Sequence, residues 1–68
     1  MPTRHETVPV ATLRPGDVVR FQGDTAWVTV RRVKRDRYGF DMLYEPFNQE
    51  PRWRGFDDGD TVTRKVAA

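Results

Sequence analysis

The 68-residue chain contains no cysteine and a single histidine, and both features limit its chemistry. Without cysteine it can form neither a disulfide nor a thiolate metal site. His5 alone cannot make a tetrahedral zinc site unless several carboxylates converge on it. Serine is also absent, so the usual serine and cysteine nucleophiles are missing. We therefore expect no enzymatic activity, no cofactor, no bound metal and no small-molecule substrate.

The chain also lacks a long apolar stretch. No segment approaches the roughly 20 apolar residues that span a bilayer. No charged and apolar leader with a small-residue cleavage site stands near the start. These features predict a cytoplasmic location without a membrane partner. A chain of this length is expected to form one domain, residues 1–68, with a thin core that buries only about 60% of the unfolded surface.

Charge of one sign does not dominate the composition. Twelve basic residues oppose ten acidic residues, which gives a formal net charge of +2 and a pI of about 9.5. The pI is high because most of the cations are arginines, which do not titrate in the accessible range. So small an excess gives weak support for a nucleic-acid partner, and the distribution of charge along the chain matters more.

What the chain does contain is a repeated turn. Residues 13–17 (LRPGD) and residues 56–60 (FDDGD) each combine an apolar anchor with a tight turn that closes on Gly-Asp. Each turn is followed by a β-branched run that ends in arginine. Turns of this kind precede strands. Further glycine-containing turns are expected at Gly23 and Gly39.

Apolar and polar residues alternate with a period of two between these turns, which indicates strands. Pro9 removes a backbone donor, so residues 7–10 are expected to form an edge strand or a strand-like arm. No window shows apolar residues at helical spacing, so we expect no α-helix beyond a single turn. The fold is predicted to be all-β, a small five- or six-stranded antiparallel SH3-like barrel. The other strands are expected at residues 18–21, 26–35, 40–45, 52–56 and 61–66.

The longest of these strands contains a phase change. Val33 is out of phase with Val28 and Val30, so we expect a β-bulge near residues 31–32 that returns Val33 to the core and bends the strand. The predicted core consists of Val8, Val10, Leu13, Val19, Phe21, Val28, Val30, Val33, Phe40, Met42, Phe56 and Val62.

The last strand contains a conflict between charge and burial. Val62 and Val66 are expected to face inward, which places Arg64 between them on the same side. This requires Arg64 to lie at a barrel rim or the strand to bend there. The three aspartates of residues 57–60 precede this strand and are the densest carboxylates of the chain. We interpret them as turn-forming residues rather than as ligands of a cation.

A basic run is the main candidate for function. Residues 31–38 combine five cations with a tyrosine, and residues 52–54 (RWR) repeat this combination. Cations that neutralise phosphates, beside rings that stack on bases, are what binding of single-stranded nucleic acid requires. The alternative is a solvated hairpin whose charges prevent edge-to-edge pairing and pair with nearby carboxylates. The candidate nucleic-acid-binding residues are Arg31, Arg32, Lys34, Arg35, Arg37, Tyr38, Arg52, Trp53 and Arg54.

A protein partner, or a second copy of the chain, is the other class of interaction that the sequence allows. Residues 8–10 offer a strand edge to such a partner. Phe47 lies between two prolines, and we expect it to plug the open end of the barrel; the alternative is a protruding anchor for a partner. Trp27 and Trp53 are either covers half-buried by neighbouring arginine stems or an exposed patch.

One segment resembles a known motif. Residues 16–19 (GDVV), Gly23 and residues 27–30 (WVTV) are similar to the start of the KOW-type motif found in SH3-like barrels of ribosomal proteins and transcription elongation factors. The similarity covers about fifteen residues and lacks the second glycine pair expected before the Val-x-Val strand. It implies an SH3-like barrel and, for those families, a nucleic-acid partner. The size and arginine-rich composition also resemble those of short barrel proteins from actinobacteria and their phages.

Overall fold

The computed structural model describes residues 4–66 as one antiparallel sheet. Its strands are β1 (Arg4–Pro9), β2 (Val18–Arg20), β3 (Val28–Arg35), β4 (Gly39–Pro46), β5 (Arg52–Asp57) and β6 (Thr61–Val66). A single 3-10 turn, η1 (Val10–Thr12), follows β1. The described part of the chain contains no helix that is long and apolar enough to cross a membrane. The prediction of a small six-stranded antiparallel all-β fold is confirmed.

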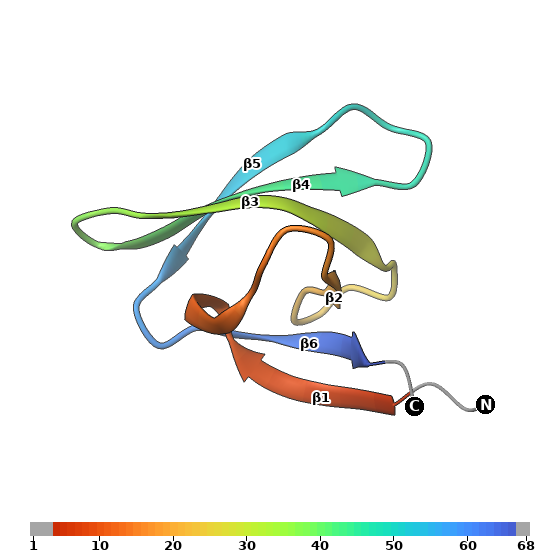
Figure 1. Ribbon diagram of the computed structural model, residues 1–68, viewed down its shortest axis with the longest axis horizontal. Coiled ribbons are helices and arrows are strands. Elements are labelled where there is room, and N and C mark those ends of the chain that lie inside the picture. Colours follow the sequence, from red (N-terminus) through yellow and green to blue (C-terminus); the bar gives the residue numbers. More distant parts are fainter. Residues whose placement is uncertain (1–3, 67–68) are drawn as a thin grey trace.

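The sheet is bent but does not close. Its strand order is β1-β6-β2-β3-β4-β5 (Figure 1). Strands β2 to β5 form a meander of chain neighbours, and β6 then returns to lie between β1 and β2. Among residues 4–66, β1 and β5 each keep one unpaired side. A closed barrel was expected, and the sheet instead retains two edges.

The two similar turns have the same geometry. In residues 14–17, the N–H of Asp17 donates to the carbonyl of Arg14 at 3.1 Å, and the Asp17 carboxylate accepts the N–H of Arg14 at 2.9 Å. In residues 57–60 the corresponding distances are 3.0 and 2.8 Å. The third residue of each turn is a glycine, with φ of 96° and 98°, a conformation that L side chains rarely adopt. The two similar sequences therefore form turns with the same hydrogen-bond pattern.

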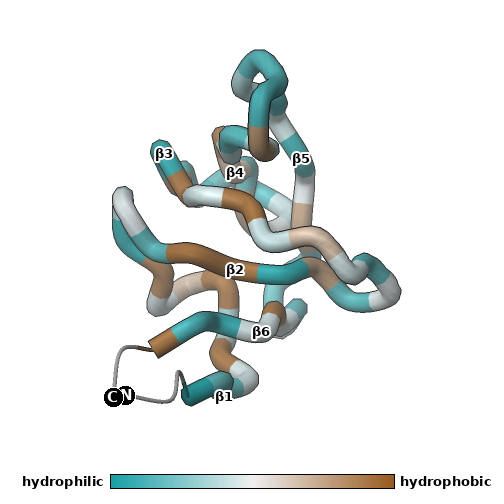
Figure 2. The backbone as a smooth tube through the Cα atoms, turned by 90° about the vertical axis from the view of Figure 1, so that its right-hand side faces the viewer, coloured by the Kyte–Doolittle hydropathy of each residue, from teal (hydrophilic) through white to brown (hydrophobic). Residues whose placement is uncertain are grey.

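The core fills the inner face of the bent sheet. All twelve predicted residues belong to the core cluster, and among residues 4–66 Tyr44 is the one member that the sequence did not predict. Figure 2 shows the apolar residues as short segments separated by hydrophilic ones, as expected for strands with one covered face. The buried members are Val10, Leu13, Val19, Phe21, Val28, Val30, Phe40, Met42 and Val62.

The predicted bulge lies where the phase of β3 changes. The pairing of β3 with β4 shifts between Val30 and Arg32, so two residues of β3 oppose one step of β4. As a result Val33, although out of phase with Val30 in the sequence, packs against the core. The bulge prediction is confirmed.

Several predicted element ends were wrong, and the first strand begins at Arg4 rather than at residue 7. β3 begins at Val28 rather than at residue 26, because β2 is only three residues long and residues 21–27 are needed to connect the strands. Val10 belongs to η1 rather than to the first strand. Its N–H donates to the carbonyl of Asp60 at 3.1 Å, which turns the chain inward at this point and buries the valine.

Candidate functional site

The register of the strands decides which side chains share a face. Directly paired residues of antiparallel strands project to the same side of a sheet, and successive residues of one strand alternate. Buried Val19, Met42 and Val62 mark the inner face, and their sequence neighbours project outward. The nine candidate residues therefore divide between two faces, although seven residues of the chain, 31–37, contain five of them.

Arg32, Lys34 and Trp53 share the outer face, and we name them the Trp53 cluster. Arg32 pairs with Leu43 and Leu43 pairs with Trp53, so the arginine and the tryptophan lie in one row across β3, β4 and β5. Lys34 Nζ lies 5.4 Å from the centroid of the Trp53 ring, within cation–π distance. The Trp53 side chain is 52% exposed. The cluster thus presents to solvent a ring with Lys34 beside it and with Arg32 two strands away in the same row.

Two other candidates contact carboxylates. Arg31 Nη1 lies 3.7 Å from Glu45 Oε2, and Arg35 Nη2 lies 3.9 Å from Asp58 Oδ2. Exposed pairs of this kind contribute little to stability, but each carboxylate offsets the charge of its arginine. The cations of the Trp53 cluster have no carboxylate within ion-pair distance in the range 4–66. Among the described residues, the same ion pairs leave Arg37, Arg52 and Arg54 without a carboxylate, so the cluster is one of several places on this half of the sheet where a cation has no ion-pair partner.

Arg52 and Arg54 lie on the other face, although they flank Trp53 in the sequence. Arg54 Cζ lies 4.6 Å from the ring centroid of Phe21 and 5.4 Å from that of Phe56. Arg54 therefore covers aromatic rings of the core at the open side of the sheet. The pairing of Arg52 with Tyr44 places it on the same inner side. Neither arginine joins the Trp53 cluster, because alternate residues of a strand face opposite sides.

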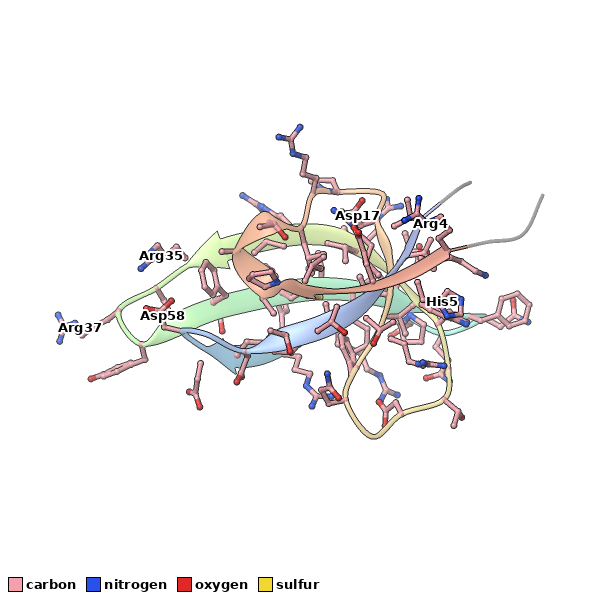
Figure 3. The ribbon with its side chains drawn as sticks, turned by 90° about the horizontal axis from the view of Figure 1, so that it is seen from below. Arg4, His5, Asp17, Arg35, Arg37 and Asp58 are labelled. Atoms are coloured by element: carbon pink, nitrogen blue, oxygen red, sulfur yellow. The ribbon has the colours of Figure 1, made fainter. Side chains whose placement is uncertain are left out.

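Arg37 and Tyr38 occupy the tip of the hairpin between β3 and β4. The carboxylate of Asp36 accepts the N–H of Tyr38 at 2.8 Å and fixes the turn. The Tyr38 side chain is 78% exposed, so it remains free to contact a partner. Figure 3 shows Arg37 at one end of the molecule and His5 toward the other end. The tip is exposed, as the sequence predicts.

Phe47 does not plug the sheet, so that prediction was wrong. Its side chain is 83% exposed. Asn48 adopts φ of 56°, and the N–H of Gln49 donates to the carbonyl of Pro46 at 3.2 Å. This tight turn directs Phe47 into solvent, while Arg54 covers the open side of the core instead. Residues 46–51 line a shallow groove of about 680 Å³ together with Trp27, Thr29 and Glu45.

A second cluster, which the sequence did not predict, surrounds Trp27. His5 of β1, Arg20 of β2 and Lys65 of β6 approach its ring, and we name these four residues the Trp27 cluster. The ring centroids of His5 and Trp27 lie 4.9 Å apart. Arg20 Cζ and Lys65 Nζ lie 5.0 and 5.1 Å from the Trp27 centroid. Trp27 is half-buried, which fits the interpretation of a tryptophan covered by basic stems.

Long-range pairing alone assembles the Trp27 cluster. His5 pairs with Lys65, and Lys65 pairs with Val18 of the strand that carries Arg20. The members stand at positions 5, 20, 27 and 65, each without a second member nearby in the sequence. No local pattern marks them. The one available signal was Trp27 itself, which shares the outer face with Thr29 in the predicted strand.

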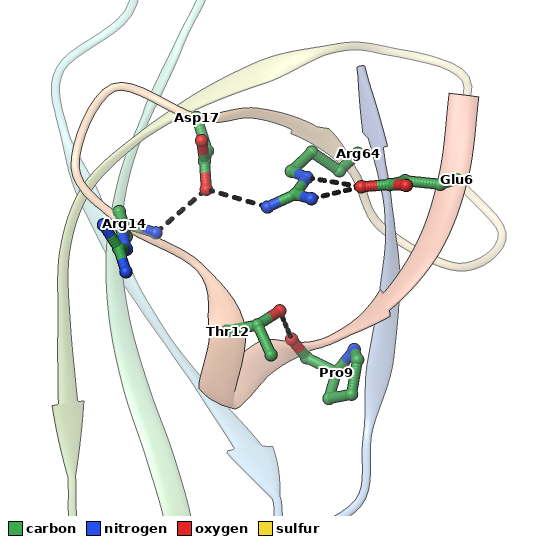
Figure 4. Close-up of polar contacts among 6 residues, drawn as sticks. All are labelled: Glu6, Pro9, Thr12, Arg14, Asp17 and Arg64. Atoms are coloured by element: carbon green, nitrogen blue, oxygen red, sulfur yellow. Dashed lines mark hydrogen bonds and ion pairs between the residues drawn. The ribbon is translucent and has the colours of Figure 1, made fainter. Parts of the chain in front are cut away.

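Arg64 lies on the inner face at the edge of the core, which resolves the conflict in β6. Its Nε donates to Glu6 Oε1 at 3.0 Å, its Nη2 donates to the same oxygen, and its Nη1 lies 3.8 Å from Asp17 Oδ2 (Figure 4). The hydrogen bond to Glu6 and the charges of Glu6 and Asp17 raise the pKa of Arg64 above its usual value, although burial acts in the opposite direction. The guanidinium is charged at neutral pH in any case, and the raised pKa extends this charge further into the alkaline range.

No protein-family model, curated protein or solved structure matches this chain. The Trp53 cluster, the Trp27 cluster and the loop that carries Phe47 are therefore the features of the molecule that indicate a function.

Proposed function

We propose that this chain is a non-catalytic module that binds single-stranded nucleic acid through the Trp53 cluster. The observation that carries the proposal is the half-exposed Trp53 ring with the Lys34 ammonium 5.4 Å from its centroid. Arg32 lies in the same cross-strand row. An exposed ring accepts a stacked base, and adjacent cations neutralise the phosphates on either side of that base.

The other candidate residues have different roles in this proposal. Arg37 and Tyr38 extend the contact surface to the hairpin tip, where both are exposed. Arg31 and Arg35 each have an acidic neighbour, Glu45 and Asp58. In this proposal each arginine leaves its carboxylate and binds a phosphate instead. Arg52 and Arg54 lie at the periphery, on the inner side. A single strand is favoured over a duplex because a ring can stack only on a base that is not already stacked.

Two features of the sheet support the SH3-like part of the proposal. The bulge of β3 and the return of β6 to β2 favour a sheet that curls toward closure. This curling supports an SH3-like architecture, in agreement with the KOW-type resemblance.

The test is binding of a fluorescently labelled oligothymidine as a function of salt. The parent protein is expected to bind at about 50 mM salt and to lose affinity steeply as salt rises. The double variant Arg32→Gln, Lys34→Gln is expected to lower the slope of log affinity against log salt by about two units. Glutamine keeps most of each side-chain stem, so packing against Trp53 is largely preserved.

A matched control removes the same charge elsewhere. Arg4→Gln with Arg14→Gln also lowers the net charge by two, but neither residue belongs to the Trp53 cluster. This control is expected to lower the salt slope by much less. The proposal is wrong if the parent does not bind at low salt, or if the control weakens binding as much as the cluster variant.

A protein partner is the second candidate function, and the exposure of Phe47 favours it. An 83% exposed phenylalanine beside a groove of about 680 Å³ is a suitable anchor for a partner or a second copy. The unpaired side of β1 adds a strand edge. If this function applies, the parent is expected to form a dimer in solution, and Phe47→Ser is expected to return it to a monomer. A monomeric parent at high protein concentration excludes self-association.

A further inference from the structure

The outer face of β1, β6 and β2 is basic and contains no carboxylate. The only acidic side chain in these three strands is Glu6, and it projects to the inner face, where Arg64 binds it. No ion pair among the described residues involves Arg20 or Lys65. By register, the outer residues are His5, Thr7, Pro9, Val18, Arg20, Thr61, Thr63 and Lys65.

We infer that the Trp27 cluster is a second contact for the same nucleic-acid strand, in which Arg20 and Lys65 bind backbone phosphates. This inference rests on the proposed function and adds a site to it. The unopposed positive charge attracts a polyanion such as a nucleic-acid backbone and repels a basic protein surface. A strand held at both clusters is bound more tightly than at either one, because the second contact forms within the complex.

The geometry of the cluster favours phosphates rather than bases as its ligands. Trp27 is half-buried, and a guanidinium and an ammonium lie 5.0 and 5.1 Å from its centroid, so little of the ring is open for stacking. The ring instead holds both cations in place, which reduces the conformational entropy that they lose on binding. Arg20 pairs with Thr63 and Thr63 pairs with Thr7, so hydroxyl donors to phosphate oxygens lie in the same row.

The two clusters lie along one path over the outer face. Trp27 directly precedes β3, and Arg32 follows five residues later on the same strand, on the order of 15 Å away along an extended chain. The groove beside Trp27 lies at the start of this path, and Glu45 and Glu50 are the acidic residues that line it. Arg31 lies 3.7 Å from Glu45 and offsets its charge. An extended single strand of several nucleotides is long enough to span this distance.

The chain has only two tryptophans, one in each cluster, so each site can be followed separately by indole fluorescence. In Trp53→Phe the remaining signal comes from Trp27, and in Trp27→Phe it comes from Trp53. An oligothymidine of about twelve nucleotides is expected to change the emission of both single-tryptophan proteins, within the usual site sizes of small barrels. One of about four nucleotides is expected to change mainly the Trp53 signal.

Charge variants test the phosphate contacts. Arg20→Gln with Lys65→Gln is expected to lower the salt slope for the longer oligothymidine by about two units and to weaken its binding at low salt roughly tenfold. Binding of the shorter oligothymidine is expected to change little. Arg4→Gln with Arg14→Gln again serves as the control of equal charge. Amide hydrogen exchange in β1, β6 and β2 checks that the cluster variant keeps its fold.

The outcomes separate this inference from the proposed function. If Trp27 emission does not respond and Arg20→Gln, Lys65→Gln binds like the control, the inference is wrong, while the Trp53 cluster is judged by its own variant. If the Trp53 signal and the Arg32→Gln, Lys34→Gln variant show no effect but the Trp27 measurements do, the proposed site is wrong and the face of β1, β6 and β2 binds the nucleic acid alone. If neither signal responds at low salt, both are wrong.

Discussion

The two halves of the sheet present tryptophan and cations to solvent, but they are assembled in different ways. The half with the Trp53 cluster is a meander in which β3, β4 and β5 pair with their chain neighbours. The half with the Trp27 cluster joins β1, β6 and β2, whose paired residues lie more than 40 positions apart in the sequence. Contacts of the first kind close short loops, and those of the second kind require the whole chain to fold.

The halves also differ in charge. The outer face of the meander mixes cations with Asp41 and Glu45, and Arg31 already contacts a carboxylate there. The outer face of β1, β6 and β2 has no carboxylate, although its cations are fewer and scattered in the sequence. A dense run of basic residues in a sequence is therefore a less reliable sign of a phosphate-binding surface than the positive charge that remains on a face once its ion pairs have been counted. Variants that act on only one half of the sheet test whether the two halves differ in this way.

The largest effect is expected for Gly39→Ala, which acts on the meander. A Cβ at Gly39 would lie 2.0 Å from the carbonyl oxygen of Phe56, so β4 and β5 would have to separate there. We expect the free energy of unfolding to fall by at least about 2 kcal/mol, measured by urea denaturation. Gly55→Ala is the control on the same strand pair, because its Cβ would meet only Asp41 Oδ1 at 3.6 Å. Equal stability of the two variants would contradict this pairing of β4 and β5.

A smaller effect is expected when the two similar turns are compared. Asp17→Ala removes the acceptor for the N–H of Arg14 and also a neighbour of Arg64, whereas Asp60→Ala removes only the acceptor for the N–H of Asp57. We expect losses of about 1–2 kcal/mol and about 1 kcal/mol, respectively, by thermal denaturation. Asn variants keep a side-chain acceptor and should recover most of each loss. If Asp60→Ala is the more destabilising variant, the contact between Asp17 and Arg64 has no energetic role.

A local effect is expected for Arg64→Gln, which acts on the other half. Arg64 links β6 to Glu6 of β1 and to Asp17, so its loss should let β1 separate from the sheet more often. Amide hydrogen exchange is expected to become faster in β1 and to stay unchanged in β4 and β5. Arg64 is charged throughout the neutral pH range, and its raised pKa extends this range upward, so the difference from the parent should persist at neutral pH. Faster exchange in all strands would show that the halves do not open independently.

The smallest effect on stability is expected for Arg35→Ala with Arg37→Ala at the hairpin tip. Both side chains are exposed, and the contact of Arg35 with Asp58 is long and solvent-accessible. The free energy of unfolding should change by no more than about 0.5 kcal/mol. Binding to single-stranded oligonucleotides at low salt should nevertheless weaken if the tip extends the contact surface. Unchanged binding would restrict the site to the face of the sheet.

Sequence patterns were sufficient to predict those features of the structure that depend on interactions between neighbouring residues. Period-two alternation predicted the core, because a strand covered on one side buries every second residue. The phase of Val33 predicted the bulge, and the two Gly-Asp sequences predicted two similar tight turns, which the structure shows to share a hydrogen-bond pattern. The same alternation also implied that Trp53 and its two arginine neighbours face opposite sides of the sheet. These three side chains therefore cannot belong to one site on a single face.

Only the tertiary structure decided which distant segments meet. The sequence did not show that β6 lies between β1 and β2, and so did not bring Trp27, Arg20 and Lys65 together. It did not show that the sheet stays open, or that Phe47 projects into solvent. Alternation and turn chemistry act over a few neighbouring residues, whereas the pairing of distant strands is chosen by the burial of the whole chain. The charge left unopposed on each face is a consequence of that pairing.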